Sequence, residues 1–228
     1  DFNNVYQWFI DTDYLDLDNT KIENFINNTI STKILNDSNY KAELQNFISA
    51  LDLGIEGIKT IPESMNDLPK SNGVVKIELL YRVENNKIKS LPLELESDGT
   101  RKMIYLFDYL IAALKKGMTL FIDDLDTKLH PLLTRYIINL FHNKEINISN
   151  AQLIYTTHDV TNLNKETFRR DEIWFTEKDN SGVSEIYSLS DYKIDNVKIR
   201  NDATFNKDYL TGRYGAIPEL KQFKMDEI

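Results

Sequence analysis

Two segments near the start of the chain carry apolar residues at the spacing of amphipathic helices. In residues 20–31 the apolar positions recur every three or four residues, and residues 40–51 repeat the arrangement. The polar stretch 36–39 predicts the connection between these helices. Residues 61–72 contain two prolines and several polar residues, which indicates a loop at a lobe boundary.

Strand-like segments follow this loop. Residues 74–83 are rich in β-branched and aromatic side chains, and a polar turn at 84–87 leads into a second apolar segment at 88–95. Together they predict a hairpin. Pro92 marks an edge position or a strand end, because proline cannot donate a ladder hydrogen bond.

From Ser97 onward, helical segments alternate with short apolar strands. This alternation predicts an α/β fold with a parallel sheet covered by helices. A turn at 179–182 predicts that the last of these strands also pairs with 183–189 in a second hairpin. The expected helices are 100–116 and 131–142, and the expected strands are 118–122, 152–156 and 172–176.

Composition narrows the functional classes. The 228 residues include 41% hydrophobic positions, enough for one core with a smaller appended lobe. A net charge of -9 disfavours a general grip on a nucleic-acid backbone, so direct nucleic-acid binding stays open but unsupported. The absence of cysteine excludes disulfides and thiolate chemistry in this chain. No apolar run reaches the ~18 residues of a membrane span, which predicts a cytoplasmic location and no membrane contact.

Two adjacent acids end the strand predicted at 118–122. Open α/β sheets bind ligands at the carboxyl ends of their strands. Asp123 is suited to hold Mg²⁺, which prefers carboxylates together with substrate phosphates, and Asp124 would orient or deprotonate an attacking water. The alternative is a polar strand end that only caps the next helix.

Two further features have ordinary structural explanations when taken singly. Ser97 is a natural helix N-cap, and Gly99 would let backbone N–H groups approach an anion at the positive helix end. A capped helix without a ligand explains the same residues. His158 follows the strand predicted at 152–156, where a structural histidine is the commoner interpretation. The aromatic side chains of the strands and helices, Trp174 among them, are expected in the core.

The order of these features resembles the second half of an ABC-type nucleotide-binding domain, over about residues 90–220. Within that superfamily the chain is most similar to cytoplasmic bacterial ATPases related to abortive infection. These are similar to the ATPase subunits of anti-phage systems such as Septu and some retrons, which act beside a nuclease effector. The segments that carry the closer resemblance are 96–100, 122–126, 129–133, 156–159, 171–178 and 212–218.

The resemblance implies a role for each matching residue. Ser97, Asp98, Gly99 and Thr100 would form the signature segment, with Ser97 and Gly99 contacting the γ-phosphate of ATP held by the opposite subunit. Asp123 would be the magnesium ligand and Asp124 the catalytic acid. Asp126 would be the D-loop acid, and His158 the switch that senses the γ-phosphate. ATP and Mg²⁺ are the implied cofactors, and a homodimer or higher oligomer is the implied assembly.

The chain departs from the family pattern in two ways. No G-x-x-x-x-G-K-[ST] occurs, so a P-loop-containing N-terminal portion is missing or the site is naturally degenerate. We favour a fragment, because the chain does not begin with Met and its acid-bearing strand is intact. Residues 1–72 would then be the end of the N-terminal lobe with a helical insertion, and residues 73–228 the C-terminal lobe. The second departure is Asp124, where the family usually has Glu; the shorter side chain predicts slow hydrolysis.

These observations predict an α/β P-loop NTPase of ABC type, without its P-loop but with a helical and β-hairpin insertion. Its expected function is ATP binding and hydrolysis in a bacterial anti-phage or abortive-infection system, controlling an effector nuclease. One alternative is a DNA-repair ATPase of the SMC or RecF type, although neither a coiled-coil insertion nor a basic groove is evident. The other is a scaffold for a nuclease partner that does not hydrolyse ATP.

Overall fold

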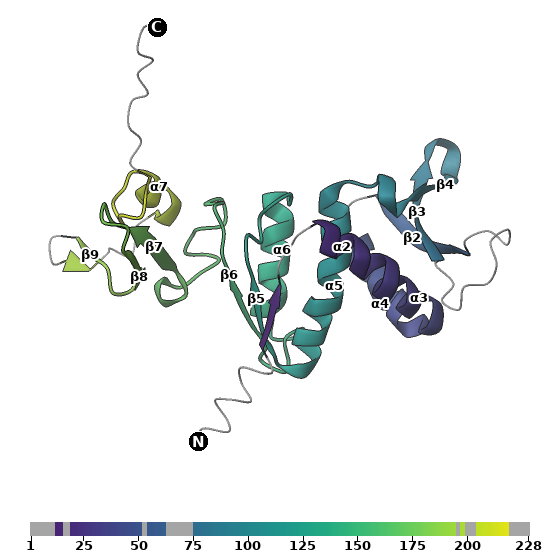
Figure 1. The fold of residues 1–228 in the computed structure, drawn as a ribbon, viewed down its shortest axis with the longest axis horizontal. Coiled ribbons are helices and arrows are strands. Elements are labelled where there is room, and N and C mark those ends of the chain that lie inside the picture. The colour runs from purple at the N-terminus through teal and green to yellow at the C-terminus, as the bar shows by residue number, and fades with distance from the viewer. Residues whose placement is uncertain are drawn as a thin grey trace, which may run out of the picture. The chain divides into compact units, whose positions relative to one another are not determined.

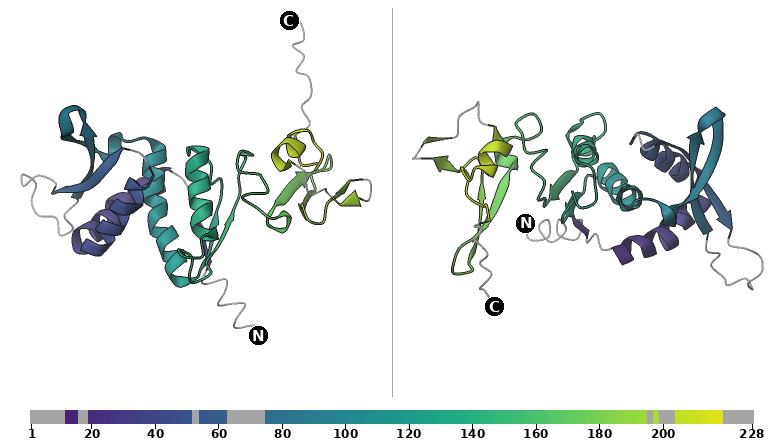
Figure 2. Two further views of the ribbon diagram at one scale, coloured as in Figure 1. Left: turned by 180° about the vertical axis from the view of Figure 1, so that it is seen from behind. Right: turned by 90° about the horizontal axis from the view of Figure 1, so that it is seen from above.

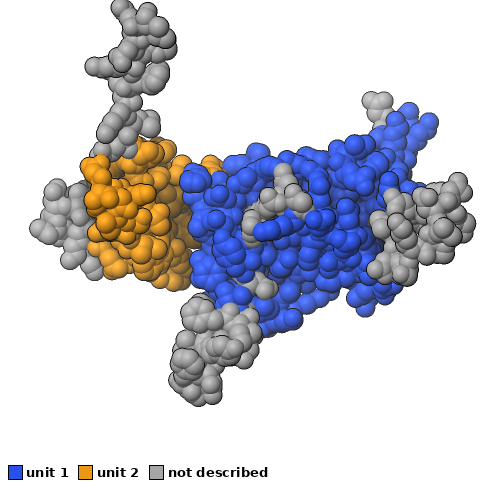
Figure 3. All heavy atoms as spheres, in the orientation of Figure 1, with its two compact units in different colours: residues 1–158 blue, residues 159–228 orange. Residues whose placement is uncertain are grey.

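The structure is a computed structural model, in which two compact units can be distinguished. Unit 1 comprises Asp1–His158 and unit 2 comprises Asp159–Ile228 (Figure 3). The predicted lobe boundary between residues 72 and 73 lies outside the described residues. The structure describes residues 12–15, 19–51, 54–62, 75–194, 197–198 and 204–218.

The first helical segment of unit 1 is longer than its sequence pattern predicts. Helix α2 (Asn19–Phe25), a π-helical turn η1 (Ile26–Ile30) and α3 (Ser31–Asn36) follow one another without a break. Asp37 alone separates them from α4 (Ser38–Ser49), so the predicted connection at 36–39 is too wide. The Asp37 carboxylate accepts hydrogen bonds from two amides of the first turn of α4, which allows the second helix to start at once.

An antiparallel sheet of β2 (Ile55–Pro62), β3 (Val75–Val83) and β4 (Lys87–Pro92) follows these helices. The hairpin predicted at 74–95 is confirmed, and β4 ends at its proline as expected. Strand β2 was not predicted, because a register shift between Ile55 and Gly57 breaks the alternation of apolar and polar positions. Its last two residues belong to the segment expected as a loop, and 63–72 lie outside the described residues.

A parallel sheet forms the centre of unit 1. Strands β1 (Thr12–Leu15), β5 (Thr119–Ile122) and β6 (Gln152–Tyr155) pair in the order β1-β5-β6. Helices α5 (Asp98–Lys116) and α6 (Pro131–His142) lie on one side of it (Figures 1 and 2). The predicted parallel sheet is therefore confirmed for β5 and β6, whereas β1 was not predicted, and α6 has the predicted bounds.

The core joins the parallel sheet to the long helix α5. Leu120 is 0% exposed and Ile122 1% exposed on the sheet side, and Phe107 of α5 is 1% exposed. The Phe107 ring packs against Phe47 and Tyr40 of α4, with ring centroids 5.1 Å and 5.6 Å away. This packing holds α5 firmly between the sheet and the N-terminal helices.

Unit 2 is built on a second hairpin. Strand β7 (Trp174–Lys178) pairs antiparallel with β8 (Ser184–Ser188), as predicted. The expectation that this segment also continues the parallel sheet is wrong, because β7 pairs with β8 in a sheet of its own. Trp174 is 57% exposed, which also corrects its expected place in the core.

The core of unit 2 is aromatic. Tyr214 is 0% exposed, and the Phe175 ring stacks on Tyr209 with centroids 5.3 Å apart. Tyr209 belongs to helix α7 (Phe205–Leu210), which was not among the predicted elements. The remaining elements are β9 (Lys193–Ile194), β10 (Val197–Lys198) and the 3-10 turns η2 (Glu84–Asn86), η3 (Leu93–Leu95) and η4 (Arg170–Glu172).

Candidate functional site

Thr156 ties the paired acids at the end of β5 to the end of β6. Its hydroxyl donates to Asp123 Oδ1 at 2.5 Å and accepts from the Asp124 amide at 2.8 Å. Thr156 also extends the strand pairing by one step, because its amide donates to the Ile122 carbonyl at 3.1 Å. Thr156 thus holds the Asp123 carboxylate and the Asp124 backbone at the carboxyl edge of the sheet, where both acids remain exposed.

His158 lies beside the second acid. Its Nε2 atom is 3.7 Å from Asp124 Oδ1, a distance that permits an ion pair when the imidazole is protonated. The imidazole is 92% exposed and the carboxylate 51% exposed, so both groups can reach a ligand from solvent. The predicted catalytic pair therefore lies close together, on the loops that follow two neighbouring strands.

The loop after the acids wraps around the buried side chain of Lys102. Asp124 and Lys128 have left-handed backbone conformations, with φ of 48° and 64°. Lys102 is 3% exposed and comes from the second turn of α5. Burial lowers the pKa of its ammonium to about 8, while the carboxylates of Asp126 and Asp124 act in the opposite direction.

The start of α5 packs against the same loop. Ser97 caps the helix by accepting from the Thr100 amide at 3.1 Å, as predicted. Asp98 forms an ion pair with Lys128, whose Nζ lies 2.7 Å from Asp98 Oδ2. The hydrogen bonds from Lys128 and then Arg101 hold the pKa of the Asp98 carboxyl below its usual value.

Gly99 is required by close packing rather than by an unusual backbone angle. A Cβ atom built at this position would lie 2.8 Å from the carbonyl oxygen of Lys128. Thr100 is buried, and its hydroxyl lies 2.9 Å from Ser97 Oγ. The first turn of α5 therefore contacts the loop through backbone as well as side chains.

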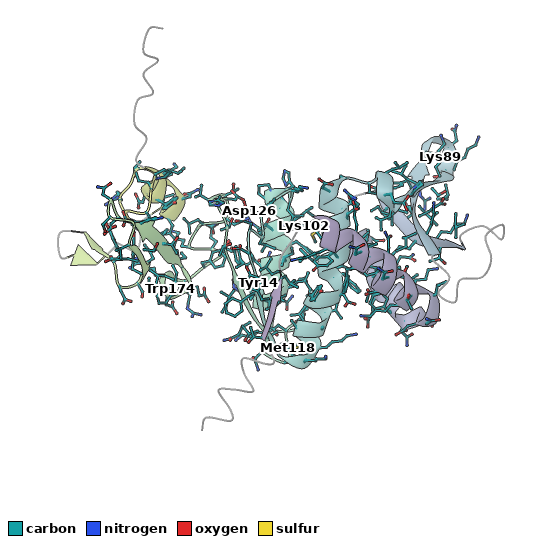
Figure 4. The ribbon with its side chains drawn as sticks, viewed as in Figure 1. Tyr14, Lys89, Lys102, Met118, Asp126 and Trp174 are labelled. Carbon is teal, nitrogen blue, oxygen red and sulfur yellow. The ribbon has the colours of Figure 1, made fainter. Side chains whose placement is uncertain are left out.

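Asp126 is the acid of the loop that has a buried carboxylate oxygen without a described hydrogen bond. It is partly buried, and among the described residues its Oδ1 atom has no hydrogen-bond partner. Figure 4 shows Asp126 and Lys102 at one end of the helices of unit 1 and Met118, which precedes β5, at the other. The D-loop acid expected from the sequence thus lies at the acid-bearing edge of the sheet.

All the residues expected in the site gather at this edge. Asp123, Asp124 and Asp126 follow β5, His158 follows β6, and the segment from Ser97 to Thr100 opens α5 against the loop. Sequence reasoning assigned no role to Thr156 or Lys102, whose contacts span more than twenty positions. The Thr-Thr-His-Asp pattern was the only signal for Thr156, and a lysine in a helix gave none.

The predicted ATP hydrolysis requires Mg²⁺, and the acids after β5 are of the type that binds this ion. No group of three or more His, Cys, Asp or Glu side chains suited to a metal occurs within the described part of the chain. Mg²⁺ does not need such a group, because it commonly binds one or two carboxylates together with substrate phosphates and water. Asp123, exposed and held at one oxygen by Thr156, could be that ligand.

The acids lie beyond the carboxyl ends of parallel strands, where open α/β sheets bind their ligands. Comparison with known families agrees, since the family model described as "AAA domain, putative AbiEii toxin, Type IV TA system" matches residues 11–164. The chain belongs to this AAA family. It is thus an ATPase-type domain with the α/β architecture expected from its sequence.

Solved structures also include a match. The Smc head domain of Pyrococcus furiosus, bound to the C-terminal domain of ScpA, is 19% identical, with a TM-score of 0.43 over 74% of this chain. The match spans 39% of the length of that Smc chain. No curated protein matches. Among the described helices, none combines the length and apolar character needed to cross a bilayer.

Proposed function

We propose that this chain is the ATP-binding and slowly hydrolysing part of a bacterial anti-phage or abortive-infection ATPase. The arrangement of Asp123, Thr156, Asp124 and His158 carries the proposal, because it directs two carboxylates and an imidazole toward one exposed edge. The family description, which names a toxin of a toxin–antitoxin system, supports the defence role. The further proposal that this ATPase controls an effector nuclease rests on the family resemblance found in the sequence.

Each side chain has a defined task in this proposal. Asp123 would hold Mg²⁺, which neutralises phosphate charge when it is bound. Asp124 accepts a proton from the attacking water or orients that water toward the γ-phosphate. His158, next to Asp124, donates a hydrogen bond to the γ-phosphate and thereby reports its presence. Thr156 holds the Asp123 carboxylate and the backbone of Asp124 in place.

The phosphate-binding loop would come from other polypeptide, since no G-x-x-x-x-G-K-[ST] motif occurs in the 228-residue sequence. The need for other polypeptide is supported by the exposed apolar side chains on the face of the parallel sheet away from α5 and α6. Tyr14, Phe121 and Ile154 are register partners there, and Tyr14 is 68% and Ile154 44% exposed. Parallel sheets are normally covered on both faces, so further polypeptide that covers this row is a physical requirement of the proposal.

The site is completed between two copies in this proposal. Ser97 and Gly99 would contact the γ-phosphate of ATP bound to the opposite subunit, where the positive end of α5 favours an anion. Asp126, with one buried oxygen lacking a described partner, would contribute from the adjoining loop. Dimerisation on ATP is therefore part of the mechanism.

The decisive experiment is an ATPase assay on the complete protein with its P-loop present. We expect Asp124→Asn to lower turnover about a hundredfold or more and His158→Ala to lower it about tenfold or more, because each removes a group that acts in the transition state. Glu145→Gln and His142→Ala change exposed residues remote from the acids and serve as matched controls. Unchanged rates in Asp124→Asn and His158→Ala would favour a scaffold that does not hydrolyse ATP.

A further inference from the structure

Lys102 is a buried cation whose partners are all backbone carbonyls. Its Nζ atom donates to the carbonyl oxygens of Asp124, Leu125 and Thr127 at 3.2 Å, 2.9 Å and 2.8 Å. A lysine ammonium has three N–H donors and no acceptor. Each donor therefore has one carbonyl, all of them supplied by the loop that follows the paired acids.

Packing alone does not explain a lysine at this position. Burial disfavours the charged form, and the side chain is only 3% exposed. An apolar side chain of similar length would fill the same space without that penalty. It would, however, leave the inward-facing carbonyls of Leu125 and Thr127 without the donor they have here, and the loop would have to turn them toward water.

Other contacts hold the two ends of the loop. At its start the amides of Asp124 and Leu125 donate to the hydroxyl and the carbonyl of Thr156, at 2.8 Å and 3.1 Å, and at its end Lys128 pairs with Asp98. Within it, the Thr127 amide donates to the Asp124 carbonyl and the Leu129 amide to the Asp126 carbonyl, at 3.1 Å and 2.9 Å. These bonds close two turns, and the Leu125 side chain, 0% exposed, packs into the core. Among the described hydrogen bonds, those from Lys102 are the ones that hold the carbonyls of Leu125 and Thr127. The left-handed backbone at Asp124 also turns this residue away from its preferred conformation, which requires support from outside the loop.

We propose that Lys102 is a positioning residue that holds the loop 124–127 in the shape that directs the Asp124 and Asp126 carboxylates. It sits one turn beyond Ser97 on α5, so the same helix fixes both the signature segment and the acids. This inference rests on the proposed function for its effect on turnover. Its structural part, the dependence of loop shape on Lys102, stands independently of ATP.

Two measurements on Lys102→Met test the proposal in the complete protein. Amide hydrogen exchange should become faster in the loop 124–129 and stay unchanged in β5 and α6, because only the loop loses its support. The kcat for MgATP should fall about tenfold or more while KM stays within about twofold, as expected for a displaced catalytic acid. Lys115→Met is the matched control, since Lys115 lies on the same helix but is exposed and pairs with Glu43.

The outcomes separate this inference from the proposed function. If Lys102→Met folds and its loop exchanges as slowly as in the wild type, the inference is overturned, whatever happens to turnover. If the loop loosens while the wild type shows no ATPase activity, positioning is supported and the proposed function fails. A change in KM alone, with kcat and loop exchange intact, also contradicts positioning.

A second variant keeps the test valid if Lys102→Met does not fold. Lys102→Gln retains amide donors on a shorter, uncharged side chain, so we expect intermediate loop exchange and an intermediate kcat. Wild-type exchange in the loop together with a wild-type kcat in folded Lys102→Gln overturns the proposal.

Discussion

Asp124 occupies the position where the related ATPases usually have a glutamate, and its surroundings leave room for the longer side chain. Its carboxylate is 51% exposed, and its Oδ1 atom lies 3.7 Å from Nε2 of the exposed imidazole of His158. The backbone amide of Asp124 donates to Thr156, which holds the start of the loop in place. The reach of this side chain therefore limits the rate that we expect.

The first prediction concerns that reach. Asp124→Glu should raise ATP turnover in the complete protein, by up to about a hundredfold, because one methylene restores about 1 Å of approach to the attacking water. Steady-state hydrolysis at saturating MgATP measures the effect, with Asp191→Glu in an exposed turn of unit 2 as the control. Rapid wild-type turnover that Asp124→Glu does not increase would contradict this account of Asp124.

For single residues, the sequence predicts a role where that role follows from a position at the end of a strand or at the start of a helix. Asp123, Asp124 and Ser97 were found because strand ends and helix starts have recognisable patterns. Lys102 and Thr156 were not assigned roles, because their importance depends on partners that only the fold brings near. Gly99 was noted for anion approach, whereas its close neighbour is the Lys128 carbonyl.

The start of α5 is attached to the acid-bearing loop by the pair Asp98–Lys128, with Arg101 as a second partner of the same carboxylate. These bonds hold the Asp98 pKa below the usual range, so the folded state binds this proton more weakly than the unfolded chain. The stabilising contribution is therefore fully present above the unfolded pKa. It is lost as the pH falls through the lower folded pKa.

A pH-dependent prediction follows for this pair of elements. Asp98→Asn should lower the urea midpoint of unit 1 at about pH 7, and the difference from the wild type should shrink below about pH 4, where the unfolded carboxyl begins to bind protons. Urea titrations followed by circular dichroism at about pH 7 and about pH 3 measure it. Glu145→Gln is the control, and a difference that stays constant with pH would exclude the ion pair as its source.

The elements themselves were predictable where one physical signal dominated. Helix α6 has the predicted bounds because Pro131 opens it and apolar periodicity continues to its end. Strand β2 was missed because its bulge disturbs the alternation, and β1 because four residues carry too little pattern. Strand β7 was assigned to two sheets, and only the antiparallel pairing is correct, since hairpin turns act locally whereas sheet membership is a tertiary property.

The whole molecule consists of two units with separate cores, and the expected site lies in unit 1 up to its final residue, His158. The family match covers 11–164 and so includes every residue of the proposed site. Unit 2 has its own aromatic core around Tyr214, and the late segment 212–218 that contributed to the sequence resemblance packs there. The nucleotide proposal accordingly depends on unit 1 and on the polypeptide that supplies a P-loop.

The most direct measurement is an experimental structure of the complete protein with Mg²⁺ and a non-hydrolysable ATP analogue. We expect the metal beside the Asp123 carboxylate, the γ-phosphate facing Asp124 and His158, and the start of α5 facing the nucleotide of a second copy. Nucleotide bound away from the carboxyl ends of β5 and β6, with Asp123 remote from the metal, would contradict the account.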